Sequence, residues 1–287
     1  MARALGTAAR RIREFRPSAL VGVGGYGTVP PALAARALGL PVVLLEQNVR
    51  PGKANRFLAP AAARICVQWE EARNAFAGSG ARVRVTGSPI RASLRPLPRD
   101  EARRRLGLDP ALPTLAVVGG SQGAEALNRG ALEGLDGAAS RLQVVHVAGA
   151  GKSEAVRDAY RARGARAVVL DFLAEMHYLY SAADLVVSRA GALAVAELAA
   201  FGTPSVLVPI ARSSGDHQRE NARAAARTGG AILMEEKDCV AGGLAPVLRR
   251  LVSEPGGFER MREAMRPLAR PGAAEAILSE ISEIVKR

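Results

Sequence analysis

The strongest constraint on the fold is a regular alternation between short apolar runs and alanine-rich stretches with helical spacing. Strand–helix–strand units of this length build a parallel sheet that is covered by helices on both faces. The sequence therefore predicts the α/β class. The predicted strands are Ala19–Val23, Pro41–Leu45, Arg64–Val67, Val83–Val85, Leu115–Val118, Gln143–Val147, Ala167–Leu170, Leu185–Val187, Ser205–Val208 and Ala231–Leu233. The predicted helices are Pro31–Leu38, Ala124–Leu135, Glu154–Arg163, Met176–Ala182, Leu193–Ala200 and Gln218–Arg227.

The segment Arg95–Arg99 is the best candidate for a linker, because it holds two prolines in five residues. We therefore expect two Rossmann-like domains, over residues 1–99 and 100–270, of which the first is short. The C-terminal part of the chain has only helical spacing. Residues 271–287 are expected to form a helix that packs back on the N-terminal domain.

The basic charge of the chain is confined to its first third. Residues 1–105 hold 19 Arg and Lys against six Asp and Glu, whereas the remaining residues hold 21 of each sign. A basic excess is typical of proteins that bind nucleic acid or an anionic membrane. Arginine-rich coding bias on a solvated surface is the alternative, although bias alone predicts an equal excess in both parts.

Two polar loops follow the first two predicted strands, at the edge of the sheet where open α/β folds bind ligands. The first, 23–31, contains Gly24, Gly25 and Gly27, which allow close approach of a ligand to the backbone. It is also compatible with an ordinary tight turn. The second begins with Glu46-Gln47-Asn48. Burying these groups without partners costs a few kcal/mol each, so they either hydrogen-bond within the loop or face a polar ligand.

Four further loops carry groups that suit a nucleotide. Arg91 follows a predicted strand and is able to pair with phosphate, although a surface role is equally ordinary for one arginine among 36. The run Gly119–Ala124 opens a helix and suits an anion, but it lacks the spacing of either common phosphate-binding motif. Glu197 lies in the first turns of a helix, where it either accepts hydrogen bonds from ribose hydroxyls or interacts favourably with the helix dipole. His217 and Gln218 begin another helix.

Several other classes of protein are disfavoured by spacing. The three histidines lie in separate elements and no Cys-x-x-Cys is present, so a metal site is not expected. The aromatic residues are too few and too scattered for a platform that stacks bases, so nucleic acid is not an expected partner. No apolar run reaches the roughly 18 residues that would span a bilayer.

Taken in order, these loops resemble the MurG family of peptidoglycan glycosyltransferases over roughly residues 17–285. The motifs that carry the resemblance are Gly24-Gly25-Tyr26, Glu46-Gln47-Asn48 with Asn55, Gly119–Ala124 with Asn128, Arg189–Glu197 and Asp216–Asn221. The resemblance implies the GT-B fold and an inverting transfer that uses neither metal nor cofactor. It implies transfer of N-acetylglucosamine (GlcNAc) from UDP to the 4-hydroxyl of undecaprenyl-pyrophosphoryl-MurNAc-pentapeptide, which converts lipid I to lipid II. The implied location is peripheral, at the cytoplasmic face of the cell membrane, with the basic N-terminal domain facing its anionic surface.

The resemblance also assigns candidate residues. Arg91 and Ser121 would approach the pyrophosphate, Leu173 would flank the uracil, Glu197 would hold the ribose, and Asn48 and Gln218 would reach the sugar. The full donor set is Asn48, Arg91, Ser121, Asn128, Leu173, Arg189, Ala192, Leu193, Ala194, Val195, Ala196, Glu197 and Gln218. The acceptor-side candidates are Tyr26, Glu46 and Asn55, and the catalytic base is unassigned.

The chain also departs from the family pattern. It starts at what resembles a later helix, so the N-terminal domain is expected to be truncated and to lack a glycine-rich loop that contains His. Leu45 stands where many members have His, and Ala194 replaces a common Thr. A donor-binding remnant without activity and a GT-B enzyme with a different acceptor therefore stay open as alternatives.

Overall fold

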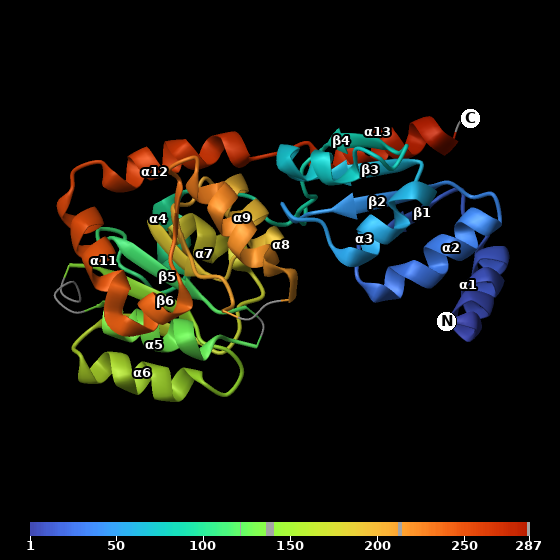
Figure 1. Ribbon diagram of the computed structural model, residues 1–287. Helices are drawn as coiled ribbons and strands as arrows, with labels where there is room; N and C mark the ends of the chain where they lie inside the picture. The colour runs from blue at the N-terminus through green and yellow to red at the C-terminus, as the bar shows by residue number, and fades with distance from the viewer. Residues whose placement is uncertain (121, 136–140, 212–213, 286–287) are drawn as a thin grey trace. The chain divides into compact units, whose positions relative to one another are not determined.

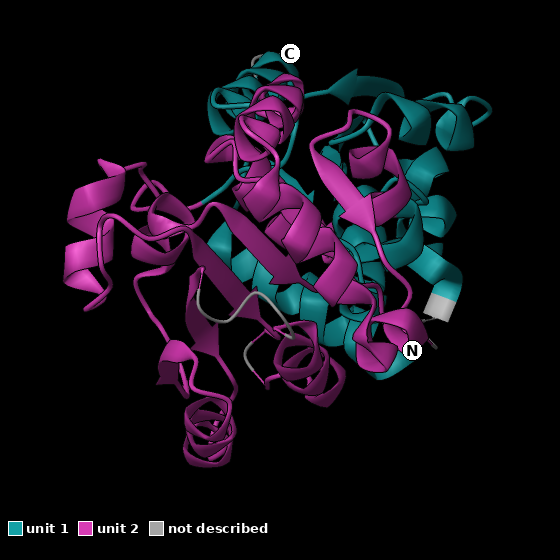
Figure 2. Ribbon diagram, turned by 90° about the vertical axis from the view of Figure 1, so that its left-hand side faces the viewer, with its two compact units in different colours: residues 1–90, 214–220, 270–287 teal, residues 91–213, 221–269 magenta. Residues whose placement is uncertain are grey.

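The computed structural model describes residues 1–120, 122–135, 141–211 and 214–285. Its contacts divide the chain into two compact units, each built around its own sheet (Figures 1 and 2). Unit 1 comprises Met1–Ile90, Ser214–Glu220 and Arg270–Arg287, and unit 2 comprises Arg91–Ser213 and Asn221–Ala269. No local sequence pattern indicates that the short segment Ser214–Glu220 belongs with unit 1.

Unit 1 contains a parallel sheet in the order β1-β2-β3-β4. Strand β2 is buried along its whole length, which explains the apolar run of its first four residues, Val42–Leu45. The strands are β1 (Leu20–Gly22), β2 (Val42–Glu46), β3 (Arg64–Val67) and β4 (Arg82–Val85). The helices are α1 (Ala2–Phe15), α2 (Val29–Ala37), α3 (Lys53–Leu58) and α13 (Ala273–Val285), with 3-10 turns at Tyr26–Thr28, Ala59–Ala61 and Glu70–Phe76.

Helix α13 covers one face of the unit 1 sheet, beside β3 and β4 in Figure 1. Its Ile277 packs with Val43, Leu45 and Cys66 in a small apolar core. The buried guanidinium of Arg64 lies 2.8 Å from the carboxylate of Glu280 on α13. Helix α13, near the C-terminus, therefore completes the apolar core of the unit 1 sheet.

Unit 2 contains a parallel sheet in the order β10-β9-β8-β5-β6-β7. The strands are β5 (Thr114–Val118), β6 (Gln143–Val147), β7 (Arg166–Leu170), β8 (Leu185–Ser188), β9 (Ser205–Leu207) and β10 (Ala231–Leu233). The helices are α4 (Arg99–Arg105), α5 (Glu125–Gly134), α6 (Ser153–Ala162), α7 (Met176–Ala182), α8 (Ala192–Ala200), α9 (His217–Ala226), α10 (Glu236–Asp238), α11 (Leu244–Ser253) and α12 (Gly257–Met265). Helix α9 begins in unit 1 and continues into unit 2.

The strand order of unit 2 reverses between β5 and β8, which is the switch point of a doubly wound sheet. Val118 pairs with Ser188 at this place, so the loops that follow β5 and β8 leave neighbouring strand ends. Two parallel α/β sheets confirm the predicted fold class. The expected site therefore centres on the loops 119–124 and 189–191.

Candidate functional site

The loop after β5 lies so close to the loop after β6 that only glycine fits at the contact. A Cβ atom on Gly123 would lie 2.1 Å from the carbonyl oxygen of Ala148, and one on Gly149 would lie 2.6 Å from the Cα of Gly123. Both glycines have positive φ angles, of 67° and 100°. Backbone thus packs on backbone at the switch point. Ser121, the predicted pyrophosphate residue of this loop, lies outside the described residues.

Asn128 supports the loop after β6 from inside the unit and is buried, with 2% of its surface exposed. Its side-chain amide donates to the carbonyl oxygen of Ala148 at 3.1 Å, and its Oδ1 lies 3.0 Å from His146 Nε2. His146 Nδ1 lies 2.9 Å from the Tyr160 hydroxyl. Burial lowers the pKa of His146 from 6.5 to about 3, so its ring is neutral and donates to Asn128 while it accepts from Tyr160. Asn128 therefore anchors the loop after β6 through Ala148, while His146 on β6 fixes the other end of its amide.

The first turn of α8 presents backbone N–H groups at the end of β8. Gly191 caps the helix with extended dihedral angles, and the first intrahelical bond runs from Val195 N to Gly191 O at 3.0 Å. The N–H groups of Ala192, Leu193 and Ala194 thus precede the helical ladder, which is the arrangement that binds anions. Leu193 is exposed, whereas the side chain of Val195 is fully buried in the core.

Glu197, on the same helix, has a partner that sequence reasoning missed. The hydroxyl of Tyr180 on α7 donates to Glu197 Oε2 at 2.9 Å. Burial first and the Glu197 charge second raise the pKa of Tyr180, while the nearby charge of Arg91 lowers it. Arg91 itself is exposed, so a cation, a phenol and a carboxylate share this part of unit 2. The only feature of Tyr180 that the sequence shows is its place in a largely apolar helix, and that pattern is typical of a core residue.

Arg189 and Leu173 complete the predicted set in unit 2. The Arg189 guanidinium lies 2.5 Å from the Glu236 carboxylate and donates to the carbonyl oxygens of Val208 and Pro209 at 3.3 Å each. Its role here is to hold the segment after β9. Leu173 is half-buried. It follows Asp171, whose carboxylate accepts the N–H groups of Lys152 and Ser153 at the start of α6.

In unit 1, the buried carboxylate of Glu46 organises the loop after β2. Its Oε1 accepts the backbone N–H and the side-chain amide of Asn48, at 3.0 and 3.1 Å. Its Oε2 accepts the N–H of Gly52 and the amide of Asn55, each at 2.9 Å. Four donors thus point at one carboxylate that is 3% exposed. The sequence left open whether these polar groups hydrogen-bond within the loop or face a ligand. For Glu46, hydrogen bonding within the loop is the answer.

Asn55 is bound on one side only. Its amide nitrogen donates to Leu45 O at 3.0 Å as well as to Glu46, but its buried Oδ1 has no hydrogen-bond partner among the described residues. A Cβ atom on Gly24 would lie 3.5 Å from this amide, so the loop after β1 passes close to it. An unpartnered buried acceptor beside a glycine loop is suited to a ligand donor.

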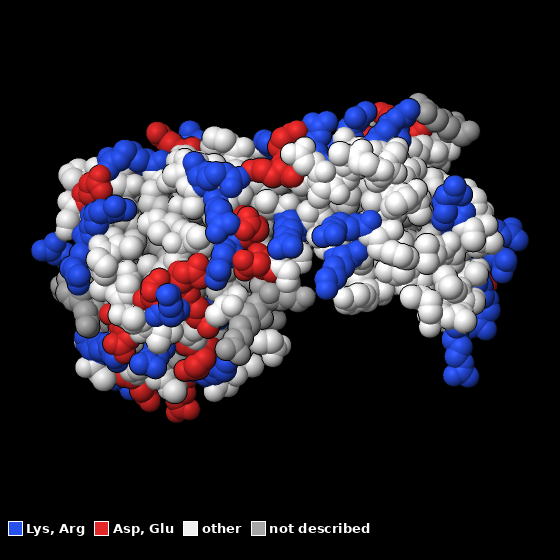
Figure 3. All heavy atoms as spheres, in the orientation of Figure 1, with Lys and Arg blue, Asp and Glu red and all other residues white. Residues whose placement is uncertain are grey.

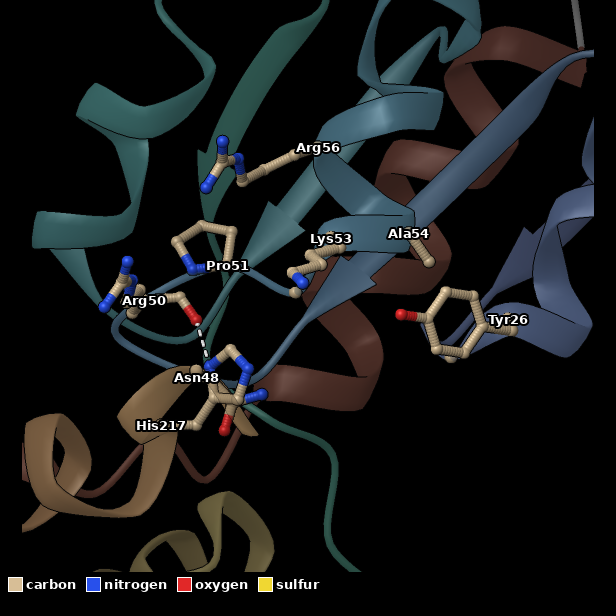
Figure 4. Close-up of a pocket in the computed structure, with 11 residues that line it drawn as sticks. Tyr26, Asn48, Arg50, Pro51, Lys53, Ala54, Arg56 and His217 are labelled. Carbon is tan, nitrogen blue, oxygen red and sulfur yellow. Dashed lines mark hydrogen bonds between the residues drawn. The ribbon is translucent and has the colours of Figure 1, made fainter. Parts of the chain in front are cut away.

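A cavity of about 300 Å³ opens next to these loops within unit 1 (Figure 4). The side chains of Arg50, Lys53 and Arg56 surround it, and none forms an ion pair with a described residue. His217 hydrogen-bonds the carbonyl oxygen of Arg50 at 2.8 Å, and Figure 4 shows the Tyr26 hydroxyl pointing toward Lys53. The cavity therefore offers three exposed cations to an anionic group. Gln218 follows His217 in the first turn of α9 and also belongs to unit 1.

Basic side chains also gather over α1 at the surface of unit 1 (Figure 3). Within the described ranges, no helix is both long and apolar enough to cross a membrane. In the same ranges, no three side chains of His, Cys, Asp or Glu gather in a group that suits a metal ion.

Two family descriptions match the chain. Residues 1–67 match the N-terminal domain of glycosyltransferase family 28, and residues 114–277 match its C-terminal domain. The chain is 41% identical over 280 residues to the UDP-N-acetylglucosamine–N-acetylmuramyl-(pentapeptide) pyrophosphoryl-undecaprenol N-acetylglucosamine transferase of Pseudomonas fluorescens, covering 96% of this chain and 76% of the relative. It is 38% identical to the protein of that name from Moorella thermoacetica, covering 99% and 78%.

Comparison with solved structures indicates the same family. The crystal structure of Acinetobacter baumannii MurG superimposes with a TM-score of 0.81 at 30% identity, covering 97% of this chain and 77% of that one. UDP-GlcNAc 2-epimerase from Neisseria meningitidis, solved with UDP-GlcNAc bound, has a TM-score of 0.71 at 16% identity, and at that identity shares the fold alone. The chain is thus a glycosyltransferase with the predicted GT-B architecture, and it belongs to the MurG branch of glycosyltransferase family 28.

Proposed function

We propose that this glycosyltransferase moves GlcNAc from UDP-GlcNAc to the 4-hydroxyl of undecaprenyl-pyrophosphoryl-MurNAc-pentapeptide. The observation that carries the proposal is the start of α8, where N–H groups ahead of the helical ladder and the Glu197 carboxylate lie at the switch point of unit 2. A nucleoside diphosphate suits both features, since its phosphates are anionic and its ribose carries a diol. The relatives at 38–41% identity carry this activity in their names.

The donor is assigned to unit 2. The N–H groups of Ala192–Ala194 bind the diphosphate, and Glu197 accepts the ribose hydroxyls. Leu173 flanks the uracil and Arg91 neutralises phosphate charge. Asn128 and Arg189 act through the backbone that they hold, because their polar atoms bind carbonyl oxygens within the unit. Val195 and Ala196 continue the helix, and Ser121, Asn48 and Gln218 stay as predicted contacts to the phosphates and the sugar.

The proposed chemistry is a single displacement. The acceptor oxygen forms a bond to the anomeric carbon as the bond from that carbon to the UDP oxygen breaks, which inverts the configuration. The hydroxyl proton passes to a base, and the electron pair of the broken bond leaves on UDP. Helix N–H groups and Arg91 stabilise the charge that develops on the leaving diphosphate. Glu46 positions Asn48 in this scheme, since its oxygens are occupied by four N–H donors.

The acceptor is assigned to unit 1. Tyr26 and the Oδ1 of Asn55 offer hydrogen bonds to its sugar, and Arg50, Lys53 and Arg56 suit its anionic groups. The basic surface over α1 suits the anionic cytoplasmic face of the cell membrane, where the lipid-linked acceptor is embedded. The protein is therefore proposed to work as a peripheral membrane enzyme.

Transfer is tested with radiolabelled UDP-GlcNAc and purified lipid I in detergent micelles. We expect label in a lipid product that carries one GlcNAc on O4 of MurNAc, identified by mass spectrometry after mild acid release. Calorimetry with UDP runs beside the assay. Folded protein that binds UDP but yields no labelled lipid would overturn the transferase proposal and favour a donor-binding protein. Label on a different acceptor would overturn only the assignment of the acceptor.

A further inference from the structure

Tyr180 is held rigidly beside Glu197 inside unit 2. It lies on α7 and is 4% exposed, with its ring centroid 5.3 Å from that of Phe201. The hydroxyl of Thr203 donates to its carbonyl oxygen at 3.3 Å. Packing and a backbone bond thus restrain the phenol, and its O–H still points at Glu197 Oε2, 2.9 Å away.

This contact binds one carboxylate oxygen of Glu197. Tyr180 is the only hydrogen-bond partner of this carboxylate in the described part of the chain, and Oε1 makes no such bond there. A glutamate has three side-chain torsions, and ordering it on ligand binding costs on the order of 1–2 kcal/mol. A carboxylate already held by one oxygen avoids part of that cost. Burial and the Glu197 charge raise the pKa of Tyr180, so the phenol stays protonated and remains a donor at any ordinary pH.

We infer that Tyr180 is a positioning residue that sets the Glu197 carboxylate to receive the two ribose hydroxyls of a uridine nucleotide. The inference rests on the proposed donor site and adds a specificity function to it. Through Glu197, Tyr180 selects donors that carry both the 2′- and the 3′-hydroxyl. Its phenol touches no part of the nucleotide in this arrangement.

Tyr180→Phe removes only the hydroxyl and keeps the ring packed against Phe201. Tyr178→Phe is the matched control, since Tyr178 lies on the same helix and makes its ring contact with His177 instead. Calorimetry compares UDP with 2′,3′-dideoxy-UDP. We expect Tyr180→Phe to lower the affinity for UDP about tenfold, as for loss of a hydrogen bond to a charged group. The affinity for dideoxy-UDP should stay unchanged. Tyr178→Phe should match the parent for both ligands, and thermal melting confirms that each variant is folded.

A double-mutant cycle with Glu197→Ala separates positioning from general structural support. On the Glu197→Ala background, Tyr180→Phe should change UDP affinity less than twofold. In turnover, Tyr180→Phe should raise KM for UDP-GlcNAc and leave kcat within twofold of the parent. Equal losses for UDP and dideoxy-UDP, or full additivity in the cycle, would overturn the inference. A parent that is folded but binds no UDP would instead overturn the proposed function, and this assignment with it.

Discussion

At the scale of single residues, Glu46 shows how a buried charge is used when it faces no solvent. Its carboxylate accepts four N–H groups from Asn48, Gly52 and Asn55, so the loop after β2 is wound around it. Such a carboxylate is well satisfied only as an acceptor. Its amide analogue places an NH₂ group against donors, and that conflict costs about 1–3 kcal/mol.

We therefore expect Glu46→Gln to lower the free energy of unfolding of unit 1 by about 1–3 kcal/mol in urea titrations. Transfer activity should fall with it, because Asn48 and Asn55 lose their anchor, whereas UDP affinity in unit 2 should hold. Glu70→Gln is the control, since Glu70 is exposed and, among the described residues, pairs with Arg73 alone. Lost turnover with unchanged stability would make Glu46 a participant in the chemistry instead.

At the scale of elements, one hydrogen-bonded chain joins α5, β6 and α6. It runs from Tyr160 through His146 and Asn128 to the carbonyl oxygen of Ala148, next to the glycine contact of the loop after β5. The folded pKa of His146 is about 3, below its usual 6.5, because burial disfavours the charged ring. The neutral form is thus favoured on folding. Its contribution is fully present above pH 6.5 and is lost as the pH falls toward 3, since the unfolded chain gains a proton that the folded chain excludes.

The expected cost is about 1.4 kcal/mol of unfolding free energy per pH unit within this window. Between pH 6.5 and 5 this amounts to about 2 kcal/mol, to be read from urea titrations at each pH. His146→Gln should be less stable at pH 7, but its free energy of unfolding should no longer fall with pH in this window. His177→Gln, at a partly exposed position of α7, serves as the control and should keep it. Parallel pH profiles for parent and His146→Gln would refute the argument.

At the scale of the whole molecule, the charge imbalance predicts which surface makes the proposed contact with a membrane. The net charge of +13 lies within residues 1–105, and α1 exposes Arg3, Arg10, Arg11 and Arg13 together with an exposed Phe15. Each basic residue near an anionic bilayer contributes about 1 kcal/mol. Changing these four arginines to Gln should therefore weaken binding to phosphatidylglycerol vesicles at least tenfold in sedimentation assays.

The matched control changes four exposed arginines of unit 2, Arg129, Arg161, Arg163 and Arg250, to Gln. It removes the same charge and should leave vesicle binding nearly unaltered. Equal losses for the two variants would show that net charge, rather than the surface over α1, governs the interaction. Binding of the parent should also weaken steeply with salt.

Prediction from sequence succeeded where the signal is local and failed where it is not. Every predicted strand overlaps an observed one, because a buried parallel strand needs an apolar run whatever lies around it. The helices over Lys53–Leu58 and Arg99–Arg105 and the 3-10 turns were not predicted, because they are too short for a helical period to show in the sequence. Asn128 and Arg189 were singled out as contacts, yet their side chains bind carbonyl oxygens of their own unit. Their role in binding UDP-GlcNAc stays a prediction.

The alternation of strands and helices, the glycine loops at strand ends and the one-sided charge are properties of the chain by itself. They determine the α/β class and the membership of the family, and they predict the edge of each sheet that carries ligand groups. Only the tertiary structure decided that Tyr180 holds Glu197, that Glu46 is enclosed by four donors, and that Ser214–Glu220 joins the first unit. The physical reason is that helix and strand preferences act over a few residues. A hydrogen bond between side chains on different elements depends on where packing brings those elements, and no local pattern records it.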